Sequence, residues 1–178
     1  MKLLFIVLCT HLPFTLQAQV VGEEVERNIL VAQDLRDVEI LTTFLRSKEP
    51  AVRAKAALSS GSVQDTLLIS ILTDLLRDTS DVVRAASAFA IGQLNYVVDS
   101  AQRRIISQVL VDQLRSERSD HVLQKTVEGL GKVGDLHSLS ELIELAEQSH
   151  VLPNPEVSLS IGRYAFRGIM SERGAAYA

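Results

Sequence analysis

The sequence predicts an all-α fold, an α-solenoid of about four helical hairpins preceded by a lead helix. The composition is 47% hydrophobic but only 4% aromatic, which favours packed helices over a β-sandwich. Apolar residues recur with helical spacing along the chain. Segments of similar sequence recur at offsets of 31 and 39 residues, and hairpins that cannot bury their apolar faces alone become stable when stacked.

The repeated segment spans ten residues and ends in glycine. Residues 52–61 align with residues 83–92 at an offset of 31, and residues 122–131 follow at a further 39. An amphipathic segment precedes each copy. Its apolar residues are Ile40, Leu41, Phe44 and Leu45, then Ile71, Leu72, Leu75 and Leu76, then Val109, Leu110 and Leu114. The expected helices are a lead helix at 23–34 and pairs at 38–46 with 50–60, 66–77 with 81–94, 100–115 with 120–131, and 136–149 with 155–169.

Local signals agree with these boundaries. Pro50 suits the first turn of a helix, where a missing N–H costs nothing. Gly61, Gly92 and Gly131 are expected to end their helices, because helix ends often need the positive φ that glycine tolerates. Four aspartates precede apolar segments as expected N-caps, namely Asp37, Asp65, Asp99 and Asp135.

The pattern Val-Arg-x-x-Ala-Ala-x-Ala-Leu-Gly, preceded by Leu-Leu-Arg-Asp, resembles HEAT repeats of the bacterial, phycobilisome-lyase-like type. Residues 75–78 with 83–92 match it best, whereas Leu123 replaces the arginine in the third copy and residues 156–169 are degenerate. The resemblance covers residues 38–170 and implies an interaction scaffold. The chain is also similar to the N-terminal arrays of exported proteins that can carry a cyclophilin-type prolyl isomerase domain. This similarity leaves open an alternative function. The protein would then be the scaffold portion of such an isomerase, or of a lyase-like enzyme, whose catalytic part is absent here.

The first eighteen residues are interpreted as a secretory signal peptide. Lys2 supplies a positive charge, residues 3–8 form an apolar run, and Ala18 is a small residue before the expected cleavage at Gln19. Pro13 interrupts a stretch too short for a membrane span, which takes about 20 residues. The alternative is a buried N-terminal helix. Residues 19–178 are thus expected to be extracytoplasmic, either periplasmic or secreted, without stable membrane insertion.

Charge and cysteine content exclude several kinds of function. The net charge of −4 argues against a nucleic-acid binder, which needs a basic surface. Signal cleavage removes Cys9, the single cysteine, so no disulfide and no zinc site of the usual ligand spacing remain. No cofactor, metal or catalytic group is expected, and the protein is predicted not to be an enzyme.

Three further motifs are better explained by structure than by chemistry. Residues 129–134 spell G-x-G-x-x-G, but a dinucleotide site needs a preceding strand, and these residues follow an expected helix. Three histidines are scattered over expected helix ends and loops and are interpreted as solvated, namely His121, His137 and His150. The acidic run of Glu23, Glu24 and Glu26 is interpreted as a solvated helix start.

Arginines at repeated positions have two interpretations. Arg53 and Arg84 either present a ladder to an acidic partner or bond to carboxylates and carbonyls of neighbouring repeats. The repeat pattern favours the structural role, although Arg84 remains among the candidate partner-binding residues. Arg163 and Arg167 share one face of the last helix with Glu156 and could form an anion-binding edge, but a solvated face is preferred.

A candidate surface for a protein partner lies on the second helix of each hairpin. The positions expected to point away from the first helix are Ala54, Lys55 and Leu58, then Ala85, Ala86 and Phe89, then Gln124, Lys125 and Glu128. If second helices line a concave side, Leu58 and Phe89 form an apolar strip flanked by Lys55 and Lys125. Alternatively, Leu58 and Phe89 pack between repeats or under the lead helix. The candidate partner-binding residues are Lys55, Leu58, Arg84, Phe89 and Lys125.

The array is expected to be incomplete as a functional unit. A solenoid needs a terminal repeat with a polar outer face. The eight residues after Met170 amount to only about two helical turns. We therefore expect the chain to continue in its native context, or a partner or second copy to cover this face. The function predicted from the sequence is a non-catalytic, extracytoplasmic scaffold for protein–protein interaction.

Overall fold

The protein is a helical array with no strand among the residues that the computed structural model describes, which are 14–148 and 155–170. A lead helix, α2 (Phe14–Asp34), is followed by four hairpins. Their first helices are α3 (Val38–Leu45), α5 (Ile69–Leu75), α7 (Ser100–Ser116) and α9 (Leu136–Gln148). Their second helices are α4 (Pro50–Val63), α6 (Asp81–Gln93), α8 (Asp120–Val133) and α10 (Pro155–Phe166). Short 3₁₀ turns, η1 (Thr66–Leu68) and η2 (Leu94–Tyr96), lie before α5 and after α6.

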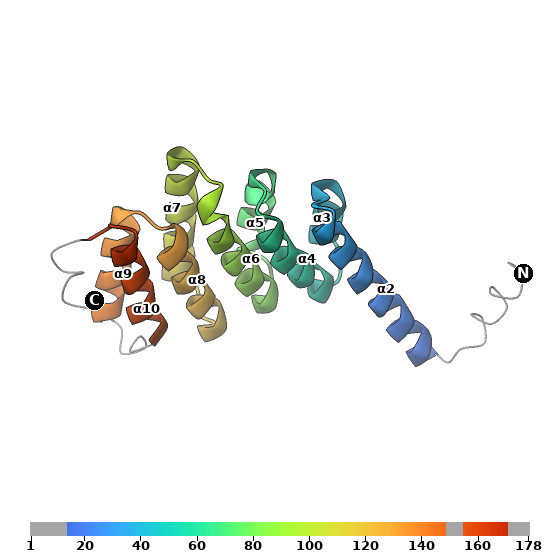
Figure 1. Ribbon diagram of the computed structural model, residues 1–178. Helices are drawn as coiled ribbons and strands as arrows, with labels where there is room; N and C mark the ends of the chain where they lie inside the picture. The colour runs from blue at the N-terminus through green and yellow to red at the C-terminus, as the bar shows by residue number, and fades with distance from the viewer. Residues whose placement is uncertain (1–13, 149–154, 171–178) are drawn as a thin grey trace, which may run out of the picture.

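The hairpins are stacked side by side, so the all-α solenoid predicted from the repeats is confirmed. Figure 1 shows the first helices in one row and the second helices in another, with α2 at one end and α10 at the other. Each second helix packs against the second helix of the next hairpin, α4 on α6, α6 on α8 and α8 on α10. Stacking of this kind buries faces that a single hairpin would leave in water.

The expected helices form close to their predicted boundaries, and α2 differs most. It begins at Phe14, directly after Pro13, rather than at residue 23. Nothing between Thr15 and Val21 breaks a helix, so α2 extends back across the predicted cleavage position between Ala18 and Gln19. The remainder of the signal peptide, residues 1–13, lies outside the described residues, and the signal peptide stays a prediction.

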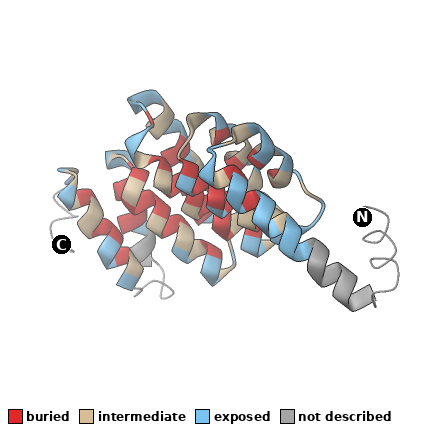
Figure 2. Ribbon diagram, turned by 45° about the vertical axis from the view of Figure 1, so that its right-hand side comes forward, coloured by how far each residue is buried: buried red, intermediate tan, exposed pale blue. Residues whose placement is uncertain are grey.

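The hydrophobic core runs continuously from α3 to α10. Its largest fully buried side chains include Leu45, Leu72, Ile91, Leu110 and Tyr164, so every hairpin contributes. Figure 2 shows that buried residues concentrate where the helices face one another. A smaller cluster joins α2 to the first hairpin through Ile29, Ala32, Leu41 and Val63. The lead helix thereby covers the first hairpin as an additional layer.

The repeat glycines lie inside their helices, which corrects the expectation that they end them. Helix α4 continues past Gly61 to Val63, and α8 continues past Gly131 to Val133. Gly61, Gly92 and Gly131 all lack positive φ, whereas Gln64, the C-cap of α4, adopts φ 55°. The residues that follow Gly61 and Gly131, up to Val63 and Val133, are therefore helical.

Close approach of neighbouring second helices explains the glycines instead. A Cβ added to Gly61 would lie 2.9 Å from the Cα of Ala90, and one added to Gly92 would lie 2.8 Å from the Cα of Gly129. On Gly131 it would lie 2.9 Å from the Cα of Ser160. Cβ atoms do not approach backbone this closely, so these positions need glycine for packing.

The predicted N-caps are confirmed. Asp37 accepts a hydrogen bond from the backbone N–H of Ile40 at 2.9 Å, and Asp65 accepts one from Leu67 at 2.8 Å. Asp99 forms a capping box with Gln102. Asp135 accepts from the N–H of Ser138, whose hydroxyl in turn accepts from the N–H of Asp135. Each aspartate satisfies amide groups that a helix start leaves unpaired.

Candidate functional site

An arginine at the same place in two successive second helices ties each of those repeats to the next. Arg53 on α4 donates from Nε and Nη2 to the two carboxylate oxygens of Asp78, both at 2.8 Å. Its Nη1 donates to the backbone oxygens of Ser47 and Lys48. The Arg53 and Asp78 side chains are only 13% and 8% exposed, so this two-pronged ion pair is largely buried between the repeats.

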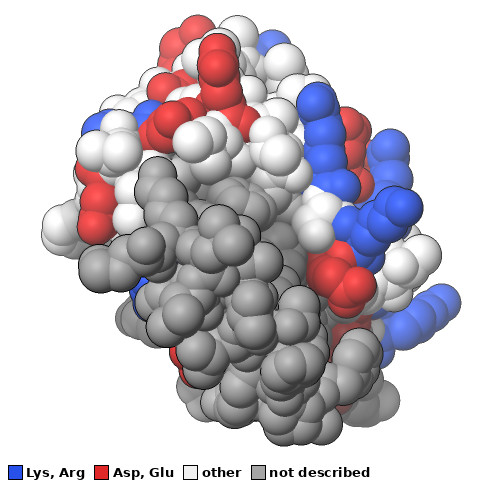
Figure 3. Space-filling view, turned by 90° about the vertical axis from the view of Figure 1, so that its right-hand side faces the viewer, with Lys and Arg blue, Asp and Glu red and all other residues white. Residues whose placement is uncertain are grey.

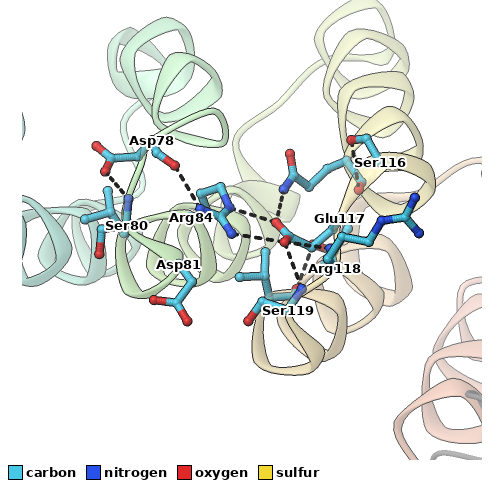
Figure 4. Close-up of polar contacts among 12 residues, drawn as sticks. Asp78, Ser80, Asp81, Arg84, Ser116, Glu117, Arg118 and Ser119 are labelled. Atoms are coloured by element: carbon cyan, nitrogen blue, oxygen red, sulfur yellow. Dashed lines mark hydrogen bonds and ion pairs between the residues drawn. The ribbon is translucent and has the colours of Figure 1, made fainter.

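Arg84 repeats the arrangement one hairpin later. Its Nε and Nη2 donate to the carboxylate of Glu117 at 2.8 and 3.0 Å, and its Nη1 donates to the backbone oxygen of Asp78 at 2.9 Å. Figure 4 shows Arg84 lying between Asp78 on one side and Glu117 on the other. Glu117 also accepts from the backbone N–H groups of Arg118 and Ser119.

The electrostatics of both carboxylates reflect these bonds. Hydrogen bonding from Arg84 lowers the pKa of Glu117 from 4.5 to about 2, against the opposing effect of burial. Burial alone would raise the pKa of Asp78, but the bonds from Arg53 and from the Ser80 N–H outweigh it and hold that pKa below its ordinary value. Both carboxylates are therefore ionised at neutral pH.

These bonds favour the structural interpretation of the arginines. The Arg84 guanidinium is engaged by Glu117 and by backbone oxygens, and its side chain is 19% exposed. Its pairing inside the stack leaves Arg84 poorly placed to meet a partner, unlike the other candidate partner-binding residues. Sequence periodicity identified the arginine positions but not the carboxylates that accept their hydrogen bonds. Asp78 and Glu117 follow first helices of different length, so they do not recur at the same spacing from the two arginines.

One row of side chains follows the second helices, exposed at its two leucines and partly buried at Phe89 and Glu128. Its members occupy equivalent repeat positions, and we call them the second-helix row, namely Leu58, Phe89, Glu128 and Leu159. Leu58 and Leu159 are 43% and 53% exposed, and Phe89 is half-buried. Leu58 and Phe89 do not belong to the hydrophobic core clusters. Leu159 extends this row beyond the residues singled out from sequence, since residues 156–169 match the repeat pattern poorly.

A charged cluster surrounds the aromatic member of the row. The Nζ atoms of Lys125 and Lys132 lie 5.5 and 4.9 Å from the centroid of the Phe89 ring, within the range of cation–π contact. Both lysines also pair with Glu128, at 2.9 and 2.7 Å. Burial would raise the pKa of Glu128, but the two lysines outweigh it and lower that pKa. Two ammonium groups thus share one carboxylate, leaving one net positive charge beside Phe89.

The other positions expected to point away from the first helices separate into two groups. Ala54, Ala85 and Ala86 are buried, at 5%, 2% and 6% exposure, and so are not available to a partner. Lys55 remains at the surface and pairs with Glu26 of α2 at 2.6 Å. Lys132 is not among the residues predicted to line the surface, although it lies seven residues after Lys125 and therefore on the same helix face.

The remaining sequence motifs occupy helices or their ends. The G-x-G-x-x-G run, residues 129–134, forms the last turn of α8 and its C-cap, a geometry unlike a strand–turn–helix phosphate loop. His121 and His137 are exposed, and His150 lies outside the described residues. The acidic run from Glu23 to Glu26 lies within α2 rather than at its start, because α2 begins at Phe14.

The two arginines of the last hairpin behave differently from a solvated pair. Arg163 pairs with Glu156 on the same helix. Arg167 follows the end of α10 and lies over the ring of Tyr164, with its guanidinium carbon 4.9 Å from the centroid. Burial lowers the pKa of Arg167. Tyr164 is fully buried, and its hydroxyl lies 2.9 Å from the Ser138 hydroxyl, which links α10 to α9.

The surface carries charges of both signs. Seen from the end at which α2 lies, Figure 3 shows basic side chains along one side with acidic ones beside them and further acidic side chains elsewhere. Within the described ranges, no three metal-ligating side chains come together as a site. No helix in the part of the chain that the structure describes is long and apolar enough to cross a membrane.

Comparison with known proteins agrees with the geometry. Residues 30–92, from the end of α2 to the end of α6, match a family model described as HEAT repeats. A search of curated proteins found no match to the chain. The stacked hairpins define an all-α solenoid, and residues 30–92 within it are similar to HEAT repeats. The phycobilisome-lyase-like subtype and the similarity to exported arrays stay predictions.

Proposed function

We propose that this protein is a non-catalytic, extracytoplasmic scaffold that binds a protein partner along the second-helix row. The supporting observation is the cluster around Phe89, where an aromatic ring outside the core lies beneath two ammonium groups that share one carboxylate. Solenoids of stacked repeats commonly use extended surfaces of this kind for binding. Leu58 and Leu159 continue the apolar character of the row on either side.

The cluster suits a partner segment with both apolar and acidic side chains. An apolar side chain would cover Phe89 and Leu58, and a carboxylate would meet the excess positive charge of Lys125 and Lys132. Aromatic anchors flanked by charge are typical of the residues that dominate binding energy at interfaces. The extracytoplasmic location rests on the composition of residues 1–18.

Site-specific photo-cross-linking tests this surface without disturbing the core. A photoreactive phenylalanine derivative replaces Leu58, which is 43% exposed, and a matched control replaces Leu67, which is 76% exposed before α5. We expect a discrete protein adduct in the extracytoplasmic fraction from position 58 and little from position 67. Equal labelling from both positions, or labelling of neither, would count against the row as the binding surface.

A further inference from the structure

The apolar part of the second-helix row is narrow. Leu58 and Phe89 occupy equivalent positions on α4 and α6. One helical turn further along the same two helices lie Ser62 and Gln93, both polar, and one turn rises only about 5 Å. One turn before Leu58 lies Lys55, which remains at the surface. The row is therefore a strip about one side chain wide, bordered by polar side chains.

A strip of this width fits an extended chain better than a helix. An α-helix with its side chains is about 10–12 Å across, and it binds a surface through apolar residues on successive turns. Laid on the row, such a helix would press apolar side chains against Ser62, Gln93 or Lys55 as well as against the row itself. An extended segment presents a single line of side chains and leaves these polar groups in water.

The spacing of the second helices selects the conformation of that segment. Packed helices lie about 8–10 Å apart. The second helices are in close contact, since a Cβ added to Gly61 would lie 2.9 Å from the Cα of Ala90 and one added to Gly92 would lie 2.8 Å from the Cα of Gly129. In polyproline II every third side chain points the same way, and three residues rise about 9 Å. Side chains on one face of a β-strand are about 6.6 or 13 Å apart, which does not match.

Charge sets the order of side chains along the segment. Lys125 and Lys132 of α8 share the single carboxylate of Glu128, at 2.9 and 2.7 Å, which leaves one net positive charge. At the α4 end, Lys55 is balanced by Glu26 at 2.6 Å. The row thus offers apolar contacts on α4 and α6 and an unbalanced positive charge on α8.

We infer that the second-helix row binds a polyproline II segment that carries two apolar residues and one acidic residue at intervals of three. This inference rests on the proposed function and names the class of partner segment. The apolar side chains contact Leu58 and Phe89, and the acidic one lies between Lys125 and Lys132. Prolines suit the intervening positions, because they fix the extended backbone before binding and reduce the entropy lost. Aromatic surfaces are the usual docking sites of such segments.

Fluorescence anisotropy with labelled synthetic peptides tests this inference on the full chain. The probes are Leu-Pro-Pro-Leu-Pro-Pro-Glu and its reverse, because a polyproline II segment can lie in either direction. We expect one of the two to bind with a dissociation constant on the order of 100 µM. A control peptide has one more proline in each interval, which turns the next side chain away from the row by about a third of a turn. Its binding should be at least about tenfold weaker, as expected for the loss of a buried leucine contact.

Two variants of the protein locate the acidic residue. Replacing the glutamate of the bound peptide by glutamine should weaken its binding to the wild type by up to about fivefold. This difference should shrink by at least half in Lys132→Gln and in Lys125→Gln, as in a double-mutant cycle. It should persist in Lys48→Gln, which removes an exposed lysine from the loop before α4. Circular dichroism checks that the helix content of all three variants matches the wild type.

Two results overturn the inference. One is that neither probe binds more tightly than its control of longer interval, which includes no binding at all. The other is a glutamate–glutamine difference that is unchanged in both Lys132→Gln and Lys125→Gln. If these peptides fail while position 58 still gives a discrete photo-cross-linked adduct, the polyproline II segment is rejected and the proposed function stands. Failure of both experiments rejects both.

Discussion

Arg84 and Glu117 form a two-pronged ion pair across the boundary between the second and third hairpins. The Nε and Nη2 atoms of Arg84 donate to separate oxygens of the Glu117 carboxylate, at 2.8 and 3.0 Å, and the Glu117 side chain is 5% exposed. Because α6 supplies one partner and the end of α7 the other, the pair fixes how two repeats stack. The equivalent Arg53–Asp78 pair does the same one repeat earlier.

The first prediction concerns acid stability. The folded pKa of Glu117 is about 2 against an ordinary 4.5, so the pair contributes stability that is fully present above about pH 4.5 and lost as pH falls toward 2. Glu117→Gln should lower the free energy of unfolding at pH 7 by at most about 3 kcal/mol. Urea unfolding of both proteins should show this difference shrink by more than half at pH 3.

A control separates this pair from general acid effects. Asp112→Asn removes an exposed carboxylate on the same helix and should change the unfolding free energy by no more than about 0.5 kcal/mol at either pH. A Glu117→Gln effect that stays the same size at pH 3 as at pH 7 would contradict the assigned role of the ionised pair.

The second prediction compares two repeat glycines. Gly92→Ala should lower the free energy of unfolding by roughly 1–3 kcal/mol, because the new Cβ would lie 2.8 Å from the Cα of Gly129 and must force two helices apart. Gly162→Ala should raise it by about 0.5–1 kcal/mol, since alanine favours helix and meets no described atom. Denaturant unfolding at low protein concentration measures both, and a loss of stability in Gly162→Ala would show that the position is packed.

The repeats allowed most of the fold to be predicted from sequence. Offsets of 31 and 39 residues set the hairpins, and the aspartate N-caps marked where helices begin. The glycines were misassigned because a helix end and a close helix crossing both select glycine. Only the neighbouring backbone, such as the Cα of Gly129 against Gly92, distinguishes the two.

The candidate surface was predictable only in part. Repeat register placed Leu58 and Phe89 together, but the contacts of Lys125 and Lys132 on α8 with the Phe89 ring on α6 join two helices. Such a contact depends on the stacking distance between α6 and α8, which periodicity does not give. For the same reason, the burial of Ala85 could not be predicted from its position in the repeat.

The third prediction concerns export. If residues 1–18 are a signal peptide, mass spectrometry of the protein recovered outside the cytoplasm should find an N-terminus at Gln19. Leu4→Lys, which interrupts the apolar run, should keep the protein uncleaved in the cytoplasm. Recovery of the exported protein with Met1 in place would show instead that these residues are retained.

The fourth prediction addresses the proposed surface through its aromatic residue. Phe89→Asp puts a carboxylate beside Lys125 and Lys132, where it would neutralise the charge offered to an acidic partner and remove the apolar contact. Helix content measured by circular dichroism should be nearly unchanged, since Phe89 lies outside the core clusters. Ile91→Asp, two residues away and fully buried, should unfold the domain.

The most direct test of the scaffold function is quantitative capture of the partner identified by cross-linking at position 58. Wild type, Phe89→Asp and the control Val82→Asp are compared, with Val82 being 55% exposed on the same helix but outside the second-helix row. The proposed function predicts at least a tenfold loss of partner with Phe89→Asp, about 1.4 kcal/mol, and retention with Val82→Asp. Equal capture by Phe89→Asp and wild type, with both folded, would contradict the assignment of this surface.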